Sequence, residues 1–401
     1  MRIGPEFHHF PSGNRPRRVL FVFAWLVVGG EETEVRLLAN HLDPARYRLD
    51  VVSCFQRPGM PEQTHEQLAA LGITVDRTPY QLSFEDTVDY LTRRLPAYDL
   101  VVACQAVPDV YPALECCPNG PALIEHGGLV TEALTGPKHL TARYVGVCQA
   151  IRDAAASRMP DRPHHALVIP SMVDLSEFHP GDREAIRREW DVGDTTPVIG
   201  WVGRLDRKKR VEDVIQAFAR IAPTWPEALL VIVGGPDAFM PEYVDELRGL
   251  TRELNLAERV RFLGDRPDVP RLMAGFDALV WLSEGEGMPH VLIEAGAAGV
   301  PVVVTPDVGA VDMVADDATG LLVPHRDPAA VARALNRLLA NPQLRRRLGL
   351  NLRRQVEQEW SAATVVPRWE RLFDEVIGER VGAGVRDQTG GQVMPELPST
   401  E

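Results

Sequence analysis

The chain has 401 residues, of which 45% are hydrophobic and 25% are charged, and its formal net charge is −13. This length predicts two hydrophobic cores, and the composition is that of an ordinary globular protein. The negative charge argues against a general nucleic-acid binder and against a protein held on membranes by a basic surface.

The first apolar run, residues 19–28, is too short to span a bilayer and lacks the cleavage pattern of a signal peptide. We therefore predict a buried strand here and no transmembrane segment. The five cysteines show no metal-ligand spacing and are odd in number, which favours free thiols and a cytoplasmic protein. Residues 1–18 are predicted to be a disordered leader, and residues 381–401 a disordered tail.

The first half of the chain alternates apolar, strand-like runs with segments of helical periodicity. Strands are expected over residues 19–28, 48–54, 73–75, 99–104, 122–125 and 144–148, and helices over 31–42, 65–71, 84–95 and 131–134. Such alternation predicts a doubly wound parallel α/β sheet. We place the end of this first domain at residue 172.

The same alternation starts again in the second half. Strands are expected over residues 198–202, 228–233, 260–263, 278–282 and 300–305, and helices over 211–221, 244–254, 328–339 and 344–357. This predicts a second Rossmann-like domain over residues 173–357. A final helix over 362–377 follows, and its segment carries an apolar stripe formed by Trp360, Trp369, Leu372, Phe373 and Val376.

The most informative stretch directly follows the strand at 278–282. Glu286 opens a turn that contains Gly287 and Pro289, and a short apolar run then leads to Glu294. In an open α/β sheet such a turn lies at the carboxyl edge, where ligands bind, and the amides at the start of the next helix attract an anion. A sugar nucleotide would offer its diphosphate to the amides and its hydroxyls to both carboxylates.

Glu286 and Glu294, with seven residues between them and a Gly-x-Pro turn, resemble the signature of the retaining nucleotide-sugar glycosyltransferases of family 4, the glycosyl transferases group 1. The resemblance extends from about residue 19 to 378 and is densest in the second half. It implies a GT-B fold, in which two Rossmann-like domains face each other across a cleft. The first domain would bind the acceptor and the second the donor, and a helix over residues 358–380 would cross back onto the first domain.

A second candidate site follows the strand at 198–202, where Gly203 and Arg204 precede Lys208 and Lys209. Glycine permits close approach of a ligand, and the cations offset the charge of a diphosphate. The resemblance places Arg204 and Lys209 on the diphosphate, although Arg210 stands where the family usually has glycine. A solvated basic turn is the alternative interpretation.

The resemblance implies the remaining roles. Glu286 would contact the donor sugar near its 3-hydroxyl, Glu294 would hold the ribose, and His126 would lie near the outer hydroxyls of the sugar. The diphosphate would also be contacted by Met288, Pro289, His290 and Val291. The base would be contacted by Leu263 and Gly264. The donor sugar and the acceptor would be contacted by the loop formed by Gly29, Gly30 and Glu31. Taken singly, the glutamates after Gly30 and the turn at Gly264 are equally well explained as ordinary turns.

Together these residues imply a retaining hexosyltransferase that moves a sugar from a UDP-sugar, or alternatively from GDP-mannose, to a hydroxyl of a small-molecule, glycan or lipid-linked acceptor. No Asp-x-Asp triplet occurs in the sequence, so neither a metal nor another cofactor is expected. The alternatives are a sugar-nucleotide epimerase on the same scaffold and a non-catalytic sugar-nucleotide-binding subunit. The combination of Arg204, Lys209, Glu286 and Glu294 argues against both.

Overall fold

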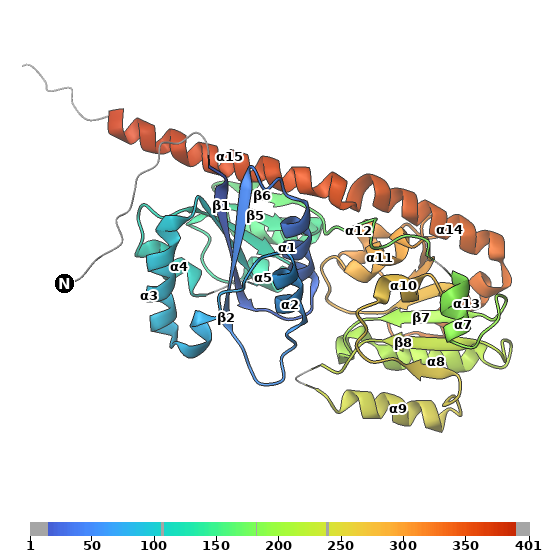
Figure 1. The fold of residues 1–401 in the computed structure, drawn as a ribbon. Coiled ribbons are helices and arrows are strands. Elements are labelled where there is room, and N and C mark those ends of the chain that lie inside the picture. Colours follow the sequence, from blue (N-terminus) through green and yellow to red (C-terminus); the bar gives the residue numbers. More distant parts are fainter. Residues whose placement is uncertain (1–14, 106–107, 182, 238–239, 390–401) are drawn as a thin grey trace, which may run out of the picture.

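The computed structural model describes residues 15–105, 108–181, 183–237 and 240–389. Two parallel six-stranded sheets, each flanked by helices, form two domains that lie side by side, and the last two helices run along the second domain and then along the first (Figure 1). The predicted GT-B architecture is confirmed. No helix in the described ranges combines the length and the apolar character that crossing a membrane requires.

The first sheet has the strand order β2-β1-β3-β4-β5-β6, and every pair is parallel. Its strands are β1 (Arg17–Trp25), β2 (Tyr47–Phe55), β3 (Leu100–Cys104), β4 (Ala122–Gly127), β5 (Thr141–Gly146) and β6 (Ala166–Val168). Its helices are α1 (Gly30–His41), α2 (Gln63–Ala70), α3 (Phe84–Arg94), α4 (Val110–Glu115), α5 (Val130–Leu134) and α6 (Gln149–Ser157). The strand order reverses between β1 and β3, so the topological switch point of this domain lies there.

Three features of the first domain differ from the prediction. Residues 73–75 form no strand, because this segment meets the edge strand β2 only through a single bridge between Asp76 and Val52. Strand β1 ends at Trp25 rather than at residue 28, and Val28 lies exposed in the following loop. The helices α4 and α6 lie outside the predicted set.

The second sheet has the order β12-β11-β10-β7-β8-β9 and is also entirely parallel. Its strands are β7 (Val198–Val202), β8 (Leu229–Val233), β9 (Val260–Phe262), β10 (Ala278–Trp281), β11 (Val302–Val304) and β12 (Leu321–Leu322). Its helices are α7 (Arg183–Glu189), α8 (Val211–Ile221), α9 (Tyr243–Glu253), α10 (Val269–Met273), α11 (His290–Ala297), α12 (Ala310–Met313), α13 (Pro328–Ala340) and α14 (Pro342–Gln355). Its switch point lies between β7 and β10.

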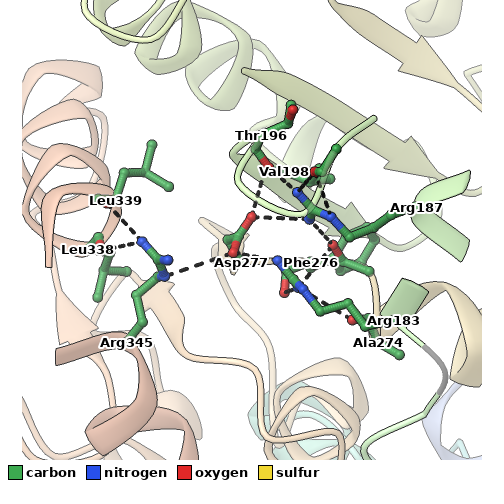
Figure 2. Close-up of polar contacts among 12 residues, drawn as sticks. Arg183, Arg187, Thr196, Val198, Ala274, Phe276, Asp277, Leu338, Leu339 and Arg345 are labelled. Carbon is green, nitrogen blue, oxygen red and sulfur yellow. Dashed lines mark hydrogen bonds and ion pairs between the residues drawn. The ribbon is translucent and has the colours of Figure 1, made fainter. Parts of the chain in front are cut away.

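A network of charged side chains fixes the amino ends of β7 and β10. Three arginines converge on Asp277, which directly precedes β10 (Figure 2). Arg183 and the fully buried Arg187 of α7 lie 2.7 and 3.3 Å from its carboxylate oxygens, and Arg345 of α14 lies at 3.9 Å. The same carboxylate accepts the backbone N–H of Val198, the first residue of β7, at 2.9 Å. Because buried charges are costly unless paired, this network holds β7, β10 and two helices in register.

The chain crosses between the domains twice, and the two crossings run together. Val173 in the interdomain linker exchanges backbone hydrogen bonds of 2.9 Å with Trp360 and Ala362. Helix α15 (Ala362–Thr389) then packs Trp369 and Phe373 into the core of the first domain, as predicted for the crossover helix.

The ends of the chain differ in part from the predicted leader and tail. Helix α15 continues nine residues past the predicted end at residue 380, and β1 starts inside the predicted leader. The rest of the predicted leader and tail, residues 1–14 and 390–401, lies outside the described residues.

Candidate active site

The carboxyl ends of the two sheets meet at a place where backbone approaches backbone. A β-carbon at Gly287, in the loop between β10 and α11, would lie 2.0 Å from the carbonyl oxygen of Gly128 in the first domain. At Gly309 it would lie 1.3 Å from the carbonyl oxygen of Gly287. Glycine is therefore required at both positions, and the loop that carries Glu286 is held directly against the first domain.

Glu286 is fixed by three groups at the switch point of the second domain. Its Oε1 atom lies 2.8 Å from Lys209 Nζ and accepts a hydrogen bond of 3.1 Å from the hydroxyl of Ser283. Its backbone N–H donates to Asp307 at 2.8 Å. The Lys208 side chain, by contrast, is exposed, and the backbone carbonyl of Lys208 accepts a hydrogen bond from the N–H of Glu284. Lys209 is thus the lysine that faces the carboxylate.

Arg210 stands where the resembled family usually has glycine, and it adopts the left-handed conformation with φ +54°. This region is the one that glycine normally supplies, so the turn keeps its shape in spite of the substitution. The guanidinium of Arg210 pairs with Glu212 and Asp213 at the start of α8, which orients it away from Lys209.

Arg204 leaves the carboxyl end of β7 and is about half exposed. Its Nε lies 2.9 Å from the carboxylate of Asp237, which is itself 5% exposed. Two glycines permit this arrangement: Gly234 has φ +135°, and a β-carbon there would lie 1.8 Å from the carbonyl oxygen of Gly203. Asp237, which the sequence analysis missed, thus orients this guanidinium at the carboxyl edge of the second sheet.

Helix α11 begins at His290, and its amino end points into the cleft beside the first domain. His290 Nε2 lies 3.1 Å from Glu34 of α1, and Glu34 also accepts the backbone N–H of Met172 at 2.9 Å. Burial lowers the pKa of His290, but the hydrogen bond and the charge of Glu34 outweigh it, so the pKa is raised. The sulfur of Met288 lies 3.3 Å from the N–H of Ser171 in the linker.

Glu294 lies one helical turn after His290 and is half buried. Burial raises the pKa of its carboxyl group, and the charges of His290 and Arg36 oppose that rise. No described residue donates a hydrogen bond to this carboxylate. It is thus available to accept hydrogen bonds from a ligand.

His126 ends β4 and is buried, with its ring edge-on to Trp369 of α15 at 5.3 Å between centroids. Its Nδ1 atom lies 3.9 Å from Glu31. Burial lowers the pKa of His126 to about 4, so the ring is neutral at neutral pH. Its side chain can therefore serve as a hydrogen-bonding group but not as a cation.

The Gly29–Gly30 loop faces the start of α11, because a β-carbon at Gly30 would lie 3.1 Å from the ring of His290. Glu31, the next residue, is buried and its Oε1 accepts no hydrogen bond from a described residue. Burial raises its pKa well above the usual range. The structure therefore brings this loop and the amino end of α11 together.

Leu263 and Gly264 lie at the outer end of the second sheet. Gly264 has φ +66°, and its carbonyl accepts the N–H of Gly234 at 2.8 Å. The carboxylate of Asp265 accepts the N–H of Gly235 at 2.7 Å. The turn after β9 is therefore joined to the turn after β8, next to the loop that carries Arg204.

The sequence analysis missed four polar residues of this site besides Asp237: Glu32, Glu34, Ser283 and Asp307. Ser283 and Asp307 lie just past β10 and β11, and this position was the available signal, whereas Glu32 and Glu34 lie within α1. Within the described ranges, no group of three or more His, Cys, Asp or Glu side chains is arranged to hold a metal ion.

The structure has two parallel α/β domains that face each other, and cations, glycine turns and carboxylates lie at the switch points of both. This arrangement defines a GT-B glycosyltransferase scaffold. Residues 182–355, which make up most of the second domain, match the family described as Glycosyl transferases group 1, and the whole chain has the GT-B fold. The resemblance seen in the sequence is confirmed.

Similar proteins share this assignment. N-acetyl-alpha-D-glucosaminyl L-malate synthase of Bacillus anthracis is 28% identical over 276 residues, 67% of this chain and 69% of that protein. D-inositol 3-phosphate glycosyltransferase of Nocardia farcinica is 32% identical over 232 residues, 56% of this chain and 51% of that protein, so this match spans about half of the relative's length. The crystal structure of Anabaena HepE with UDP and glucose has the same fold, with a TM-score of 0.78 at 22% identity over 90% of this chain and 100% of that one.

Proposed function

We propose that this protein is a retaining hexosyltransferase that moves a sugar from a nucleoside-diphosphate sugar to an acceptor hydroxyl. The observation that carries the proposal is the Lys209–Glu286 pair at 2.8 Å, at the switch point of the second domain and beside Arg204. A cation for the leaving diphosphate and a carboxylate for the sugar hydroxyls are thereby held next to each other.

The diphosphate would lie between Arg204, Lys209 and the amino end of α11. Negative charge builds up on the diphosphate as the anomeric bond breaks, and prearranged cations and amides stabilise that charge. Lys209 and Arg204 are already held by carboxylates at 2.8 and 2.9 Å, so little reorganisation is needed when the donor binds. These groups supply the positive charge, and the proposed reaction needs no metal.

Retention follows from attack on the same face as the leaving group. The bond between the anomeric carbon and the diphosphate oxygen breaks, a bond to the acceptor oxygen forms, and the acceptor proton passes to the leaving phosphate. Glu286 would hold the donor sugar, Glu294 the ribose, and neither would act as a nucleophile. Closure of the two domains would exclude water and limit hydrolysis.

A UDP-sugar is the favoured donor and GDP-mannose the alternative, with the base lying near Leu263 and Gly264. HepE, whose fold this chain shares, holds UDP in its crystal structure, which motivates testing UDP-sugars first. We place the reaction in the cytoplasm, where the free cysteines of the described chain would stay reduced.

The test is to incubate the protein with UDP-glucose and a chelator but without acceptor, and to follow the first-formed glucose anomer by proton NMR. Release of UDP with α-glucose formed first supports retention without a metal. Formation of β-glucose first, or UDP release only after metal is added, contradicts the mechanism. The matched control is Glu286→Gln, which keeps the shape of the side chain and should lose the activity.

A further inference from the structure

Helix α6 of the first domain begins without a capping side chain of its own. Its N-cap residue is Cys148, whose backbone is extended with φ −144° and whose thiol makes no capping hydrogen bond. The first N–H groups of a helix have no partner inside the helix, and Ser, Thr, Asp or Asn usually supplies one at the N-cap. Burial raises the pKa of the Cys148 thiol, and the N–H groups of Ile151 and Ala150 oppose that rise. The sulfur therefore lies beside the amides that a capping oxygen would accept.

The second domain supplies a cap instead. Asp312 of α12 accepts the N–H of Gln149, the first residue of α6, through its Oδ2 atom at 3.1 Å. The helix dipole also favours a carboxylate at this end of the helix. The first turn of α6 is thus completed by a residue of the other domain, and the hydrogen bond exists only while the two domains are in contact.

The turn that carries Asp312 also holds the loop of Glu286. In this turn between β11 and α12, Asp307 accepts the N–H of Glu286 at 2.8 Å. A β-carbon at Gly309 would lie 1.3 Å from the carbonyl oxygen of Gly287, so the turn and the loop touch through their backbones. A displacement of α12 must therefore move the Glu286 loop as well.

Apolar packing crosses the same interface but leaves a gap beside the cap. Ile151 of α6 belongs to one buried apolar cluster with Met288 and Met313 of the second domain. Next to them lies a cavity of about 200 Å³ that residues of both domains line, among them Cys148 and Asp312. Apolar contacts have no preferred direction, whereas a hydrogen bond does. The cap on α6 is thus the contact that can set the alignment of the two domains here.

We propose that Asp312 is a positioning residue for glycosyl transfer: by capping α6 across the domain interface, it holds the Glu286 loop against the first domain. Asp312 acts through this loop and does not touch the substrate. The inference rests on the proposed function, because it assigns Asp312 a role in the same reaction.

The test uses the nucleotide sugar that raises the melting temperature of the wild type, UDP-glucose first, and measures kcat and KM for UDP release. Asp312→Ala should lower kcat by about tenfold and leave KM within about twofold, because the donor binds to the second domain and only the alignment of the loop is lost. The melting temperature should fall by roughly 2–4 °C. Asp312→Asn keeps an oxygen that can cap the helix, so its kcat should stay within about threefold of wild type.

Two further variants separate the alignment of the domains from the stability of a helix. Ser83→Ala removes a cap that lies wholly within the first domain, where the Ser83 hydroxyl accepts the N–H of Asp86 in α3 at 3.1 Å. It should lower the melting temperature and leave kcat unchanged. Cys148→Ser gives α6 a cap of its own. In that background, Asp312→Ala should lower the melting temperature by less than half as much and still lower kcat by about tenfold.

Two outcomes overturn the inference. An unchanged kcat in Asp312→Ala does so. Recovery of kcat together with the melting temperature in the Cys148→Ser background does so too, because Asp312 would then only stabilise α6. If no nucleotide sugar raises the melting temperature of the wild type, the proposed function itself fails.

Discussion

His290 Nε2 of the second domain lies 3.1 Å from Glu34 Oε1 of the first, with both side chains largely buried. Because Glu34 also accepts the N–H of Met172 in the linker, one carboxylate joins both domains and the segment between them. The amino end of α11, where the diphosphate is proposed to bind, is therefore held by a residue of the first domain.

The first prediction concerns pH and this pair. The pKa of His290 is raised above its ordinary value of 6.5, so the pair's stabilisation is fully present below pH 6.5 and is lost as the pH rises through the raised pKa. Replacing Glu34 by Gln should therefore lower the melting temperature most at pH 6. The expected loss is roughly 1–3 kcal/mol there, and it should shrink toward pH 9.

His290→Gln is the matched control for this prediction, and its melting temperature should vary little when Glu34 is also replaced. A difference between wild type and Glu34→Gln that stays constant from pH 6 to pH 9 would show that the charge of His290 does not contribute.

The second prediction uses the two adjacent lysines. Lys209→Ala should lower turnover with a UDP-sugar by about a hundredfold or more, because a cation facing the leaving diphosphate is removed. Lys208→Ala should stay within about threefold of wild type, since the Lys208 side chain is exposed and its contacts with Asp206 and Glu284 are made by the backbone. Steady-state kinetics on both variants decides the assignment, and equal losses would contradict it.

Arg204→Ala should behave like Lys209→Ala and keep its fold, because the Arg204 side chain is half exposed. Circular dichroism checks the fold, and UDP release measures the activity. Wild-type turnover in this variant would remove the basis for its role on the diphosphate.

The third prediction concerns acid stability. His126 is buried, and burial lowers its pKa in the folded protein to about 4. In the unfolded chain the same side chain binds a proton near pH 6.5, whereas in the folded chain it stays neutral until about pH 4. Stability from this residue is present above pH 6.5 and is lost toward pH 4, by up to roughly 3 kcal/mol. His126→Gln should therefore show a shallower fall in melting temperature from pH 6.5 to pH 4. A parallel fall in both proteins would contradict the buried, neutral state.

Much of the fold was predictable because its signals are local. Central strands such as β8 and β10 are continuous apolar runs, since both faces of a parallel sheet are covered. The apolar stripe around Trp369 likewise predicted a helix that needs a partner, and the core of the first domain provides it. The strand expected at 73–75 failed because strand formation there depends on a neighbour that the sequence does not reveal.

The site was predictable only in its local parts. The turn between Glu286 and Glu294 is formed by consecutive residues of a recognisable type, so its position could be inferred from the sequence. The role of Glu34 could not be inferred, because it depends on how the two domains meet. The sequence around Glu34 does not differ from that of an ordinary first helical turn. The resemblance already favoured Lys209 over Lys208, and the three-dimensional turn, in which Arg210 takes the left-handed conformation, explains why the Lys209 side chain faces Glu286.

The most direct test of the donor site is thermal stabilisation by UDP-, GDP-, ADP- and dTDP-sugars, compared between wild type and Glu294→Ala. We predict that one nucleotide, with UDP favoured, raises the melting temperature of the wild type selectively. At a hundredfold excess over Kd this corresponds to roughly 3 kcal/mol. The shift should be lost in Glu294→Ala while its melting temperature without ligand stays close to that of wild type. No shift with any nucleotide sugar, or an equal shift in the variant, would contradict the donor site proposed at α11.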